Sequence, residues 1–184
     1  MLRSLFQSKK TAEILHSVGT IYSIIVDTAR KPVFYSKLSV PDTVDGRFDM
    51  IILHMFFVLN RLQHSDAGDS KAFSQQLFDY MFSDMERSLR ELGVGEVGVP
   101  KHMKRMMKGF NGRMDQYHTS LEQNDTQALT ESVRKNIFFG ADNVTSDQVK
   151  QMTTYAKAQY AHINKASIED ILSGTLTFME HKIK

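Results

Sequence analysis

Cysteine is absent from the 184-residue chain. Its absence excludes a disulfide framework, a thiolate metal site and covalently attached haem, and nothing in the composition indicates an oxidising compartment. Long apolar runs are lacking too. The longest, residues 51 to 59, is nine residues interrupted by His54, whereas a membrane-spanning helix needs about 20. We therefore expect no transmembrane segment.

A strong charge of either sign is also missing, because 23 basic and 21 acidic residues leave a formal net charge of +2. So small an excess does not indicate nucleic acid as a partner of the whole chain, and electrostatic binding would need a local patch. The first ten residues, MLRSLFQSKK, are basic but lack the apolar centre and cleavage site of a secretory signal. They predict a flexible basic arm over residues 1–10. We expect a cytoplasmic protein, with peripheral attachment to the inner face of the membrane as the alternative.

Strand signals are scarce, since the chain has three prolines, no sustained period-two alternation and no Asn-Gly or Asp-Gly turn. Helical spacing recurs instead. The sequence predicts an all-α fold, with one domain over residues 11–184 built as a bundle of about seven helices around a central antiparallel pair. The expected helices cover about 11–30, 48–62, 70–92, 100–121, 125–138 and 145–165, and a last one opens at 167.

Helix ends carry recognisable signals. Pro41-Asp42 predicts a turn and a capping side chain for the second helix, and Gly93 predicts the end of the third. Asn124 or Asp125, then Thr145 or Ser146, are expected caps for the fifth and sixth helices. Residues 167–170 resemble a capping box.

Motifs for catalysis are weak. Residues 93–98 match the spacing of a dinucleotide fingerprint, but that motif needs a preceding strand and here follows a helix. Glu13 with His16 is a single Glu-x-x-His pair, whereas a di-iron bundle needs two. His54 lies in an apolar helix, where a hydrogen-bonded core histidine is favoured over an acid-base role. We expect no enzyme, no metal site and no cofactor.

Basic residues recur at helical spacing along the fourth helix, namely Lys101, Lys104, Arg105 and Lys108. They centre opposite a stripe rich in methionine, which is interpreted as core rather than as a surface for apolar clients. The simpler interpretation is that the basic face is an ordinary solvated surface without a binding role. The functional interpretation is docking on a ribosome or on a membrane surface.

Several segments together resemble a known family. They are Val40-Pro41-Asp42-Thr43-Val44-Asp45-Gly46-Arg47-Phe48, Leu53-His54, Asn60-Arg61-Leu62, residues 78–95, Lys101 and Gly112-Arg113. In these the chain resembles the ubiquinol-cytochrome c chaperone family, and it is more similar to bacterial members than to mitochondrial ones. The candidates for partner binding that this resemblance supplies are Pro41, Asp42, Gly46, Arg47, His54, Arg61, Asp84, Arg87, Arg90, Gly93 and Gly95.

The resemblance implies an assembly factor for the cytochrome bc1 complex. Such a factor binds newly made cytochrome b, or another subunit of the complex, at the ribosome or membrane surface. It also implies a small partner protein, whose requirement in this chain the sequence leaves open. The alternative function is a helical protein that binds nucleic acid or the ribosome through the basic face of the fourth helix.

Helical geometry adds one further expectation. If the second and third helices pair antiparallel about residues 63–70, Arg47 lies level with Asp84. A carboxylate on the apolar face of the third helix is costly unless it is paired. We therefore expect a buried ion pair between Asp84 and Arg47.

Overall fold

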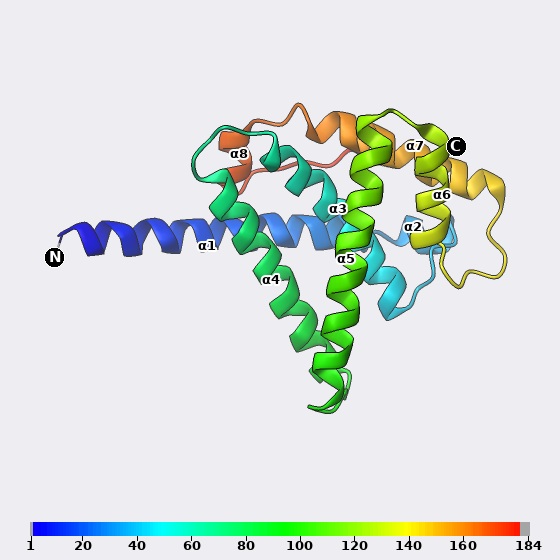
Figure 1. The fold of residues 1–184 in the computed structure, drawn as a ribbon, viewed down its shortest axis with the longest axis horizontal. Helices are drawn as coiled ribbons and strands as arrows, with labels where there is room; N and C mark the ends of the chain where they lie inside the picture. Colours follow the sequence, from blue (N-terminus) through cyan, green and yellow to red (C-terminus); the bar gives the residue numbers. More distant parts are fainter. Residues whose placement is uncertain (1, 181–184) are drawn as a thin grey trace. The chain divides into compact units, whose positions relative to one another are not determined.

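The structure is a computed structural model that describes residues 2–180, with side chains described from residue 12 onward. Within these residues the chain forms eight helices and no strand, which confirms the all-α prediction (Figure 1). In chain order the helices are α1 (Leu2–Ala29), α2 (Pro32–Ser36), α3 (Val44–Gln63), α4 (Ser70–Glu91), α5 (Gly98–Glu122), α6 (Thr126–Asn136), α7 (Ser146–Ile163) and α8 (Ile168–Leu172).

Seven of these helices match the expected ones. The additional helix, α2, has five residues and lies between the first two expected helices. Pro32 occupies its first position, where a missing N–H and a fixed φ favour helix initiation. At the other end of the chain, α8 is also only five residues long. The backbone of Leu2 to Lys10 continues α1, while the side chains of this stretch lie outside the described residues. The flexible basic arm over residues 1–10 therefore stays a prediction.

Three predicted helix caps are confirmed by hydrogen bonds. The carboxylate of Asp125 accepts from the Ala128 N–H at 2.9 Å, and the hydroxyl of Ser167 accepts from the Asp170 N–H at 3.2 Å. At α7, Thr145 and Gln148 bond to each other's backbone N–H groups in a full capping box. Each bond satisfies a donor that the first turn of a helix leaves without an intrahelical partner.

The chain divides into two compact units, each built from three separate stretches. Unit 1 comprises residues up to Ile24, Arg61–Met107 and Ala166–Thr177, and it contains α4, α8 and the first turns of α5. Its apolar core comes chiefly from α1, α4 and α8, with Val18, Ile21, Phe73, Leu77, Met81, Leu89 and Ile171. Removing such side chains from water is the main force that holds helices of this amphipathic kind together.

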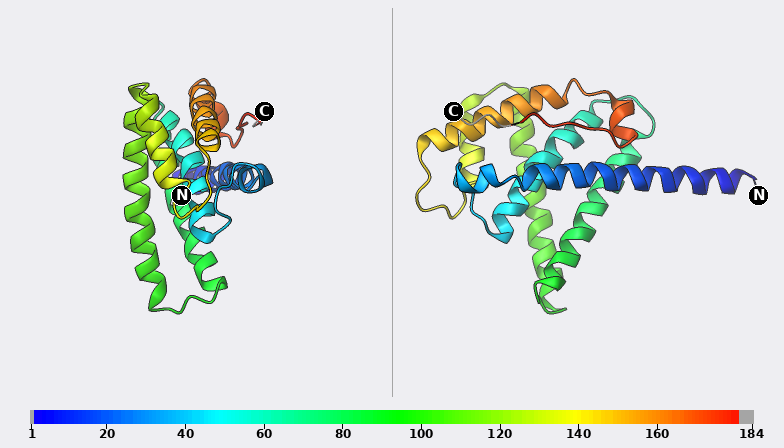
Figure 2. Two further views of the ribbon diagram at one scale, coloured as in Figure 1. Left: turned by 90° about the vertical axis from the view of Figure 1, so that its right-hand side faces the viewer. Right: turned by 180° about the vertical axis from the view of Figure 1, so that it is seen from behind.

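Unit 2 comprises Ile25–Asn60, Lys108–Lys165 and residues from Phe178 onward. It contains most of α3, whose residues Met50 to Val58 are buried without exception, as expected for a helix that is apolar almost all round. Helices α6 and α7 pack against each other in this unit (Figure 2). The single domain over 11–184 and its central antiparallel pair stay predictions, because α3 and α4 belong largely to different units.

Candidate functional site

The turn that leads into α3 carries the first group of sequence candidates. The hydroxyl of Thr43 accepts from the Gly46 N–H at 3.1 Å, so Thr43 caps α3 and the prediction that Asp42 does so was wrong. Gly46 is buried, and a Cβ there would collide with the carbonyl oxygen of Pro41. Only glycine therefore allows the turn to approach the helix this closely.

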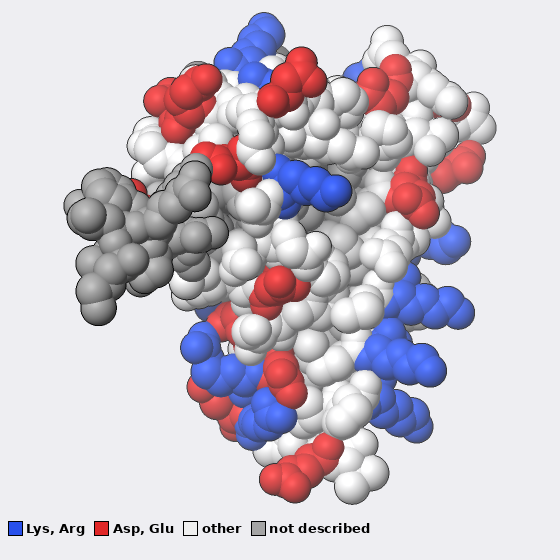
Figure 3. All heavy atoms as spheres, turned by 60° about the vertical axis from the view of Figure 1, so that its left-hand side comes forward, with Lys and Arg blue, Asp and Glu red and all other residues white. Residues whose placement is uncertain are grey.

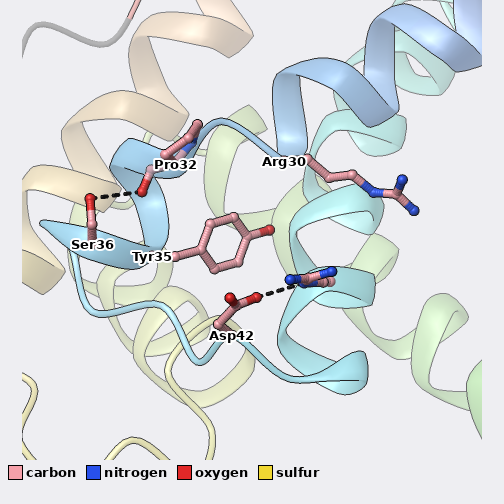
Figure 4. A pocket seen from close by; sticks show the side chains of 6 residues that line it. Arg30, Pro32, Tyr35, Ser36 and Asp42 are labelled. Carbon is pink, nitrogen blue, oxygen red and sulfur yellow. Dashed lines mark hydrogen bonds and ion pairs between the residues drawn. The ribbon is translucent and has the colours of Figure 1, made fainter.

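Asp42 does not cap α3; its carboxylate pairs with Arg47 instead. Nε of Arg47 donates to Oδ1 of Asp42 at 2.6 Å, and about half of each side chain is exposed. The pair borders a cavity of about 550 Å³ within unit 2, whose lining residues are Arg30, Pro32, Tyr35, Ser36, Asp42 and Arg47. We call this the signature cavity; Figure 4 shows Tyr35 between the segment that carries Arg30 and the loop that carries Asp42.

The signature cavity is lined by two guanidinium groups, those of Arg30 and Arg47. The hydrogen bond from Arg47 holds the pKa of Asp42 below its ordinary value, and the same bond raises the pKa of Arg47. Tyr35 donates its hydroxyl to the carbonyl oxygen of Ala29 at 2.8 Å, and burial raises its pKa to about 12. Near neutral pH the cavity therefore holds two cations, one anion and an uncharged phenol. Such a set can recognise a polar or acidic group.

His54 lies inside unit 2 and has no solvent contact. Its Nδ1 lies 2.7 Å from the carbonyl oxygen of Met50, and its Nε2 lies 2.6 Å from the hydroxyl of Tyr155. Burial lowers the pKa of His54 to about 4. The interpretation of His54 as a hydrogen-bonded core histidine is confirmed.

A buried ion pair between Asp49 and Arg113 was not predicted from the sequence. Nη2 of Arg113 lies 2.7 Å from Oδ1 of Asp49. Burial raises the pKa of Asp49 to about 7, although the nearby guanidinium opposes this shift. The sequence feature that could have predicted this pair is Asp49 itself, a carboxylate next to the apolar stretch of α3 that begins at Met50.

Asp84 and the charged residues near it belong to unit 1. The Asp84 side chain is 14% exposed, but its carboxylate accepts from the hydroxyl of Tyr22 at 2.9 Å and from Arg87 one helical turn away. Because Arg47 bonds Asp42, the predicted pair between Asp84 and Arg47 was wrong. The burial of Asp84 was predicted correctly, and only its partners were misassigned.

Two of the remaining signature candidates, Arg61 and Arg90, make hydrogen bonds within unit 1. Nε of Arg61 donates to the carbonyl oxygen of Ala166 at 3.0 Å, and Arg90 bonds Glu86 at 2.8 Å on the surface of α4. Gly93 has φ +81° and ends α4, whereas Gly95 faces open space. Most of the candidates therefore fall into a group at the turn before α3 and a group along α4 and the loop after it, while His54 and Arg61 belong to neither.

The basic face of α5 is exposed as expected. Lys101, Lys104 and Arg105 are exposed in unit 1, where Arg105 also donates to Nδ1 of His102 at 3.2 Å, and Lys108 is exposed at the start of the next stretch of unit 2. Figure 3 shows basic side chains in a row along one edge of the face that it draws and basic and acidic side chains interleaved elsewhere. The methionine stripe is only partly core, because Met106 is buried and Met107 is exposed.

Sequence reasoning missed four of the six lining residues, namely Arg30, Pro32, Tyr35 and Ser36. The one available signal was the Phe34-Tyr35 dipeptide just ahead of the signature segment. Among residues 12–180, no cluster of three His, Asp or Glu side chains is arranged to hold a metal ion. No helix in the described part of the chain combines the length and the apolar character needed to cross a bilayer.

Comparison with known proteins gives a consistent result. Residues 36–178 match the family model described as ubiquinol-cytochrome C chaperone. The chain is 23% identical over 153 residues to the mitochondrial protein CBP3 of Saccharomyces cerevisiae, covering 82% of this chain and 45% of that protein. It is 22% identical over 152 residues to the ubiquinol-cytochrome c reductase complex assembly factor 1 of Mus musculus, covering 83% of this chain and 50% of that protein. The chain thus spans about half the length of these relatives.

A solved structure matches along nearly the whole chain. The crystal structure of the Cbp3 homologue from Brucella abortus superimposes with a TM-score of 0.83 at 33% sequence identity. The superposition covers 98% of this chain and 97% of that one. A match of this extent shows that the two chains share their fold over the part superimposed.

Proposed function

Because the chain belongs to the ubiquinol-cytochrome C chaperone family, we propose that it promotes assembly of the cytochrome bc1 complex by binding a newly made subunit. The observation that carries the proposal is the family match over residues 36–178, together with a relative named as an assembly factor of the ubiquinol-cytochrome c reductase complex. The cavity chemistry supports a binding role over a catalytic one, because its phenol and carboxylate hold fixed protonation states near neutral pH.

The client that we propose is cytochrome b, the apolar membrane subunit of the complex. A holder of such a client needs apolar side chains on its surface, and each unit supplies some. Leu15 and Tyr80 are exposed in unit 1, and Val44 and Phe139 are exposed in unit 2, where Phe139 keeps 76% of its surface in solvent. These side chains are candidates for contact with the client.

The signature cavity is proposed as a contact for a partner protein. The Asp42–Arg47 pair is exposed, so its contribution to folding is small, and charged pairs of this kind set specificity at interfaces more than affinity. The partner is either the client itself or a small protein that works with the chaperone. We propose that the site of action is the cytoplasmic face of the membrane, next to the translating ribosome.

Deletion of the gene tests the proposed function. The amount of assembled bc1 complex, measured by native gel electrophoresis and by haem b absorbance in membranes, should fall while the transcripts of the complex genes stay unchanged. Affinity purification from cells pulse-labelled with methionine should recover newly made cytochrome b. Normal complex levels in the deletion strain would contradict the proposal.

The alternative function, binding of nucleic acid through α5, makes a different prediction. Affinity for ribosomal RNA should then fall steeply with salt and should not depend on the presence of client protein. Exposure of Lys101, Lys104 and Arg105 is compatible with it. Assembly that survives reversal of these charges would exclude RNA binding through this face as the basis of the function.

A further inference from the structure

The loop between α4 and α5, residues 92–97, has a fixed conformation set by its own backbone. Gly93, at φ +81°, donates its N–H to the carbonyl oxygen of Arg90 at 2.9 Å, and the Val94 N–H bonds the carbonyl oxygen of Leu89 at 3.0 Å. These two bonds form a Schellman motif. The Gly98 N–H then bonds the carbonyl oxygen of Gly95 at 2.8 Å and starts α5.

Two aliphatic side chains of this ordered loop are exposed to solvent. Leu92 is 62% exposed and Val97 is 93% exposed. The neighbouring apolar residues are shielded from solvent within unit 1: Leu89 and Val99 are buried and Val94 is half-buried. Because the backbone bonds hold the loop in this form, the exposure of Leu92 and Val97 is a property of the fold.

Basic side chains adjoin the loop on its α5 side. Lys101, Lys104 and Arg105 follow within about 11 Å of the start of α5 along its axis. Side chains of a helix lean toward its N-terminus, which here is the end that meets the loop. The three exposed cations therefore lean toward the end of α5 that the loop joins.

Lys101 and Lys104 differ from the basic residues of α4 in their pairing with carboxylates. No Asp or Glu occurs from Val97 to Met114, and among the described residues no carboxylate pairs with Lys101 or Lys104. On α4, by contrast, the basic residues pair with carboxylates on their own helix: Arg87 with Asp84 and Glu91, and Arg90 with Glu86. The charges of Lys101 and Lys104 are thus available to an external anion.

We propose that the loop and the first two turns of α5 dock on a membrane surface rich in anionic phospholipid. Leu92 and Val97 enter the boundary between headgroups and acyl chains, while Lys101, Lys104 and Arg105 contact lipid phosphates. Exposed aliphatic residues beside lysine and arginine are the combination that binds such interfaces, because apolar burial and charge attraction add. A nucleic acid would use the cations and leave the aliphatic residues without a role.

Substitution of Glu96 tests the proposal with a variant that should bind vesicles more tightly instead of more weakly. It is the one acid in the loop and is exposed, so it faces the same anionic surface as its basic neighbours. Replacing it with glutamine removes a repulsion. Glu96→Gln should therefore bind anionic vesicles more tightly than the parent.

The experiment is flotation of the full chain with vesicles of phosphatidylcholine alone and with vesicles of equal parts phosphatidylcholine and phosphatidylglycerol. The parent should float only with the anionic vesicles. Leu92→Ser with Val97→Ser should lower the partition coefficient by about tenfold or more, since aliphatic burial is lost. Reversal of Lys101, Lys104 and Arg105 to glutamate should lower it on the order of a hundredfold.

Lys71→Glu is the matched control, because Lys71 is exposed at the opposite end of α4. One reversal there should leave the partition within about twofold of the parent. The chain has no cysteine, so Val97→Cys and Lys71→Cys each give a single site for an environment-sensitive dye. Emission should shift to the blue with anionic vesicles at position 97 and stay unchanged at position 71.

Three results would overturn the proposal. The first is a parent that fails to float with anionic vesicles, and the second is flotation that is insensitive to the Leu92 and Val97 substitutions in variants with unchanged circular dichroism. The third is binding of ribosomal RNA that needs the three cations and ignores the aliphatic pair. That outcome would assign this face to nucleic acid. None of these measurements depends on bc1 assembly, so the proposal and the proposed function can fail separately.

Discussion

Nε2 of His54 lies 2.6 Å from the hydroxyl of Tyr155, which is 101 residues later in the chain. The other ring nitrogen, Nδ1, faces the carbonyl oxygen of Met50, which can only accept a hydrogen bond. Nδ1 therefore carries the proton of the neutral imidazole, and Nε2 accepts from the tyrosine hydroxyl. One buried histidine thus joins α3 to α7 inside unit 2.

Tyr155→Phe should destabilise the protein by about 1–3 kcal/mol, because it leaves the buried Nε2 of His54 without a donor. Urea unfolding followed by circular dichroism measures this free energy. Tyr80→Phe removes the same hydroxyl from an exposed ring and should change the stability by less than about 0.5 kcal/mol. Equal stabilities of the two variants would contradict the assignment of the bond.

The ion pair of Asp49 gives a dependence of stability on pH. Burial raises the pKa of Asp49 from 3.8 to about 7, so between these values the folded protein holds a proton that the unfolded chain has released. The free energy of unfolding therefore falls as the pH rises through this range, by at most about 1.4 kcal/mol per pH unit from this group.

Asp49→Asn cannot titrate and isolates this contribution. The stability of the variant minus that of the parent should increase from pH 4 to about pH 7 and level off above it. His54 acts in the opposite direction, since its lowered pKa makes the fold lose stability as the pH falls from about 6.5 toward 4. Both proteins contain His54, so its effect cancels in the difference. Urea unfolding at several pH values gives the curve, and a difference that is flat or declines with pH would refute the raised pKa.

Gly46→Ala should destabilise the protein on the order of 2–4 kcal/mol, because the new Cβ would displace the Pro41 carbonyl from the turn before α3. Gly95→Ala is the matched control, since a Cβ there meets nothing within 4 Å. Thermal melting of the two variants separates a steric cause from a general effect of losing glycine. Similar melting temperatures would show that the turn tolerates a side chain.

Asp42→Ala and Arg47→Ala should separate function from stability. Both side chains are exposed, so each variant should melt like the parent, while the amount of assembled bc1 complex in the complemented deletion strain should fall several-fold if the signature cavity contacts a partner. Asp147→Ala makes the same charge change at another exposed site of unit 2 and should restore full assembly. Full assembly with both cavity variants would remove the cavity from the functional surface.

Local sequence signals predicted the helices and their caps well. Asp125, Thr145 and Ser167 cap their helices as expected, because a cap needs only a short polar side chain two or three residues before a free N–H. The Asp42 prediction failed for a local reason too, since Thr43 stands one residue later and takes the capping position.

Contacts between distant residues were predicted poorly. The expected pair of Arg47 with Asp84 assumed that a buried carboxylate seeks a distant cation, whereas Arg87 and Tyr22 satisfy Asp84. An apolar helix pattern gives the face of a residue but not the residue opposite it. For the same reason the sequence showed His54 in the core without showing Tyr155 as its partner.

Three helices, α1, α3 and α5, each begin in one compact unit and end in the other. Each unit is therefore encoded by three gene segments separated by segments of its neighbour, and no single pair of start and stop codons yields one unit alone. A single crossover between related genes cannot exchange one unit as a block, because no one point in the chain separates all the segments of one unit from all those of the other. The two units must consequently be inherited together, and substitutions in one are selected in the presence of the other.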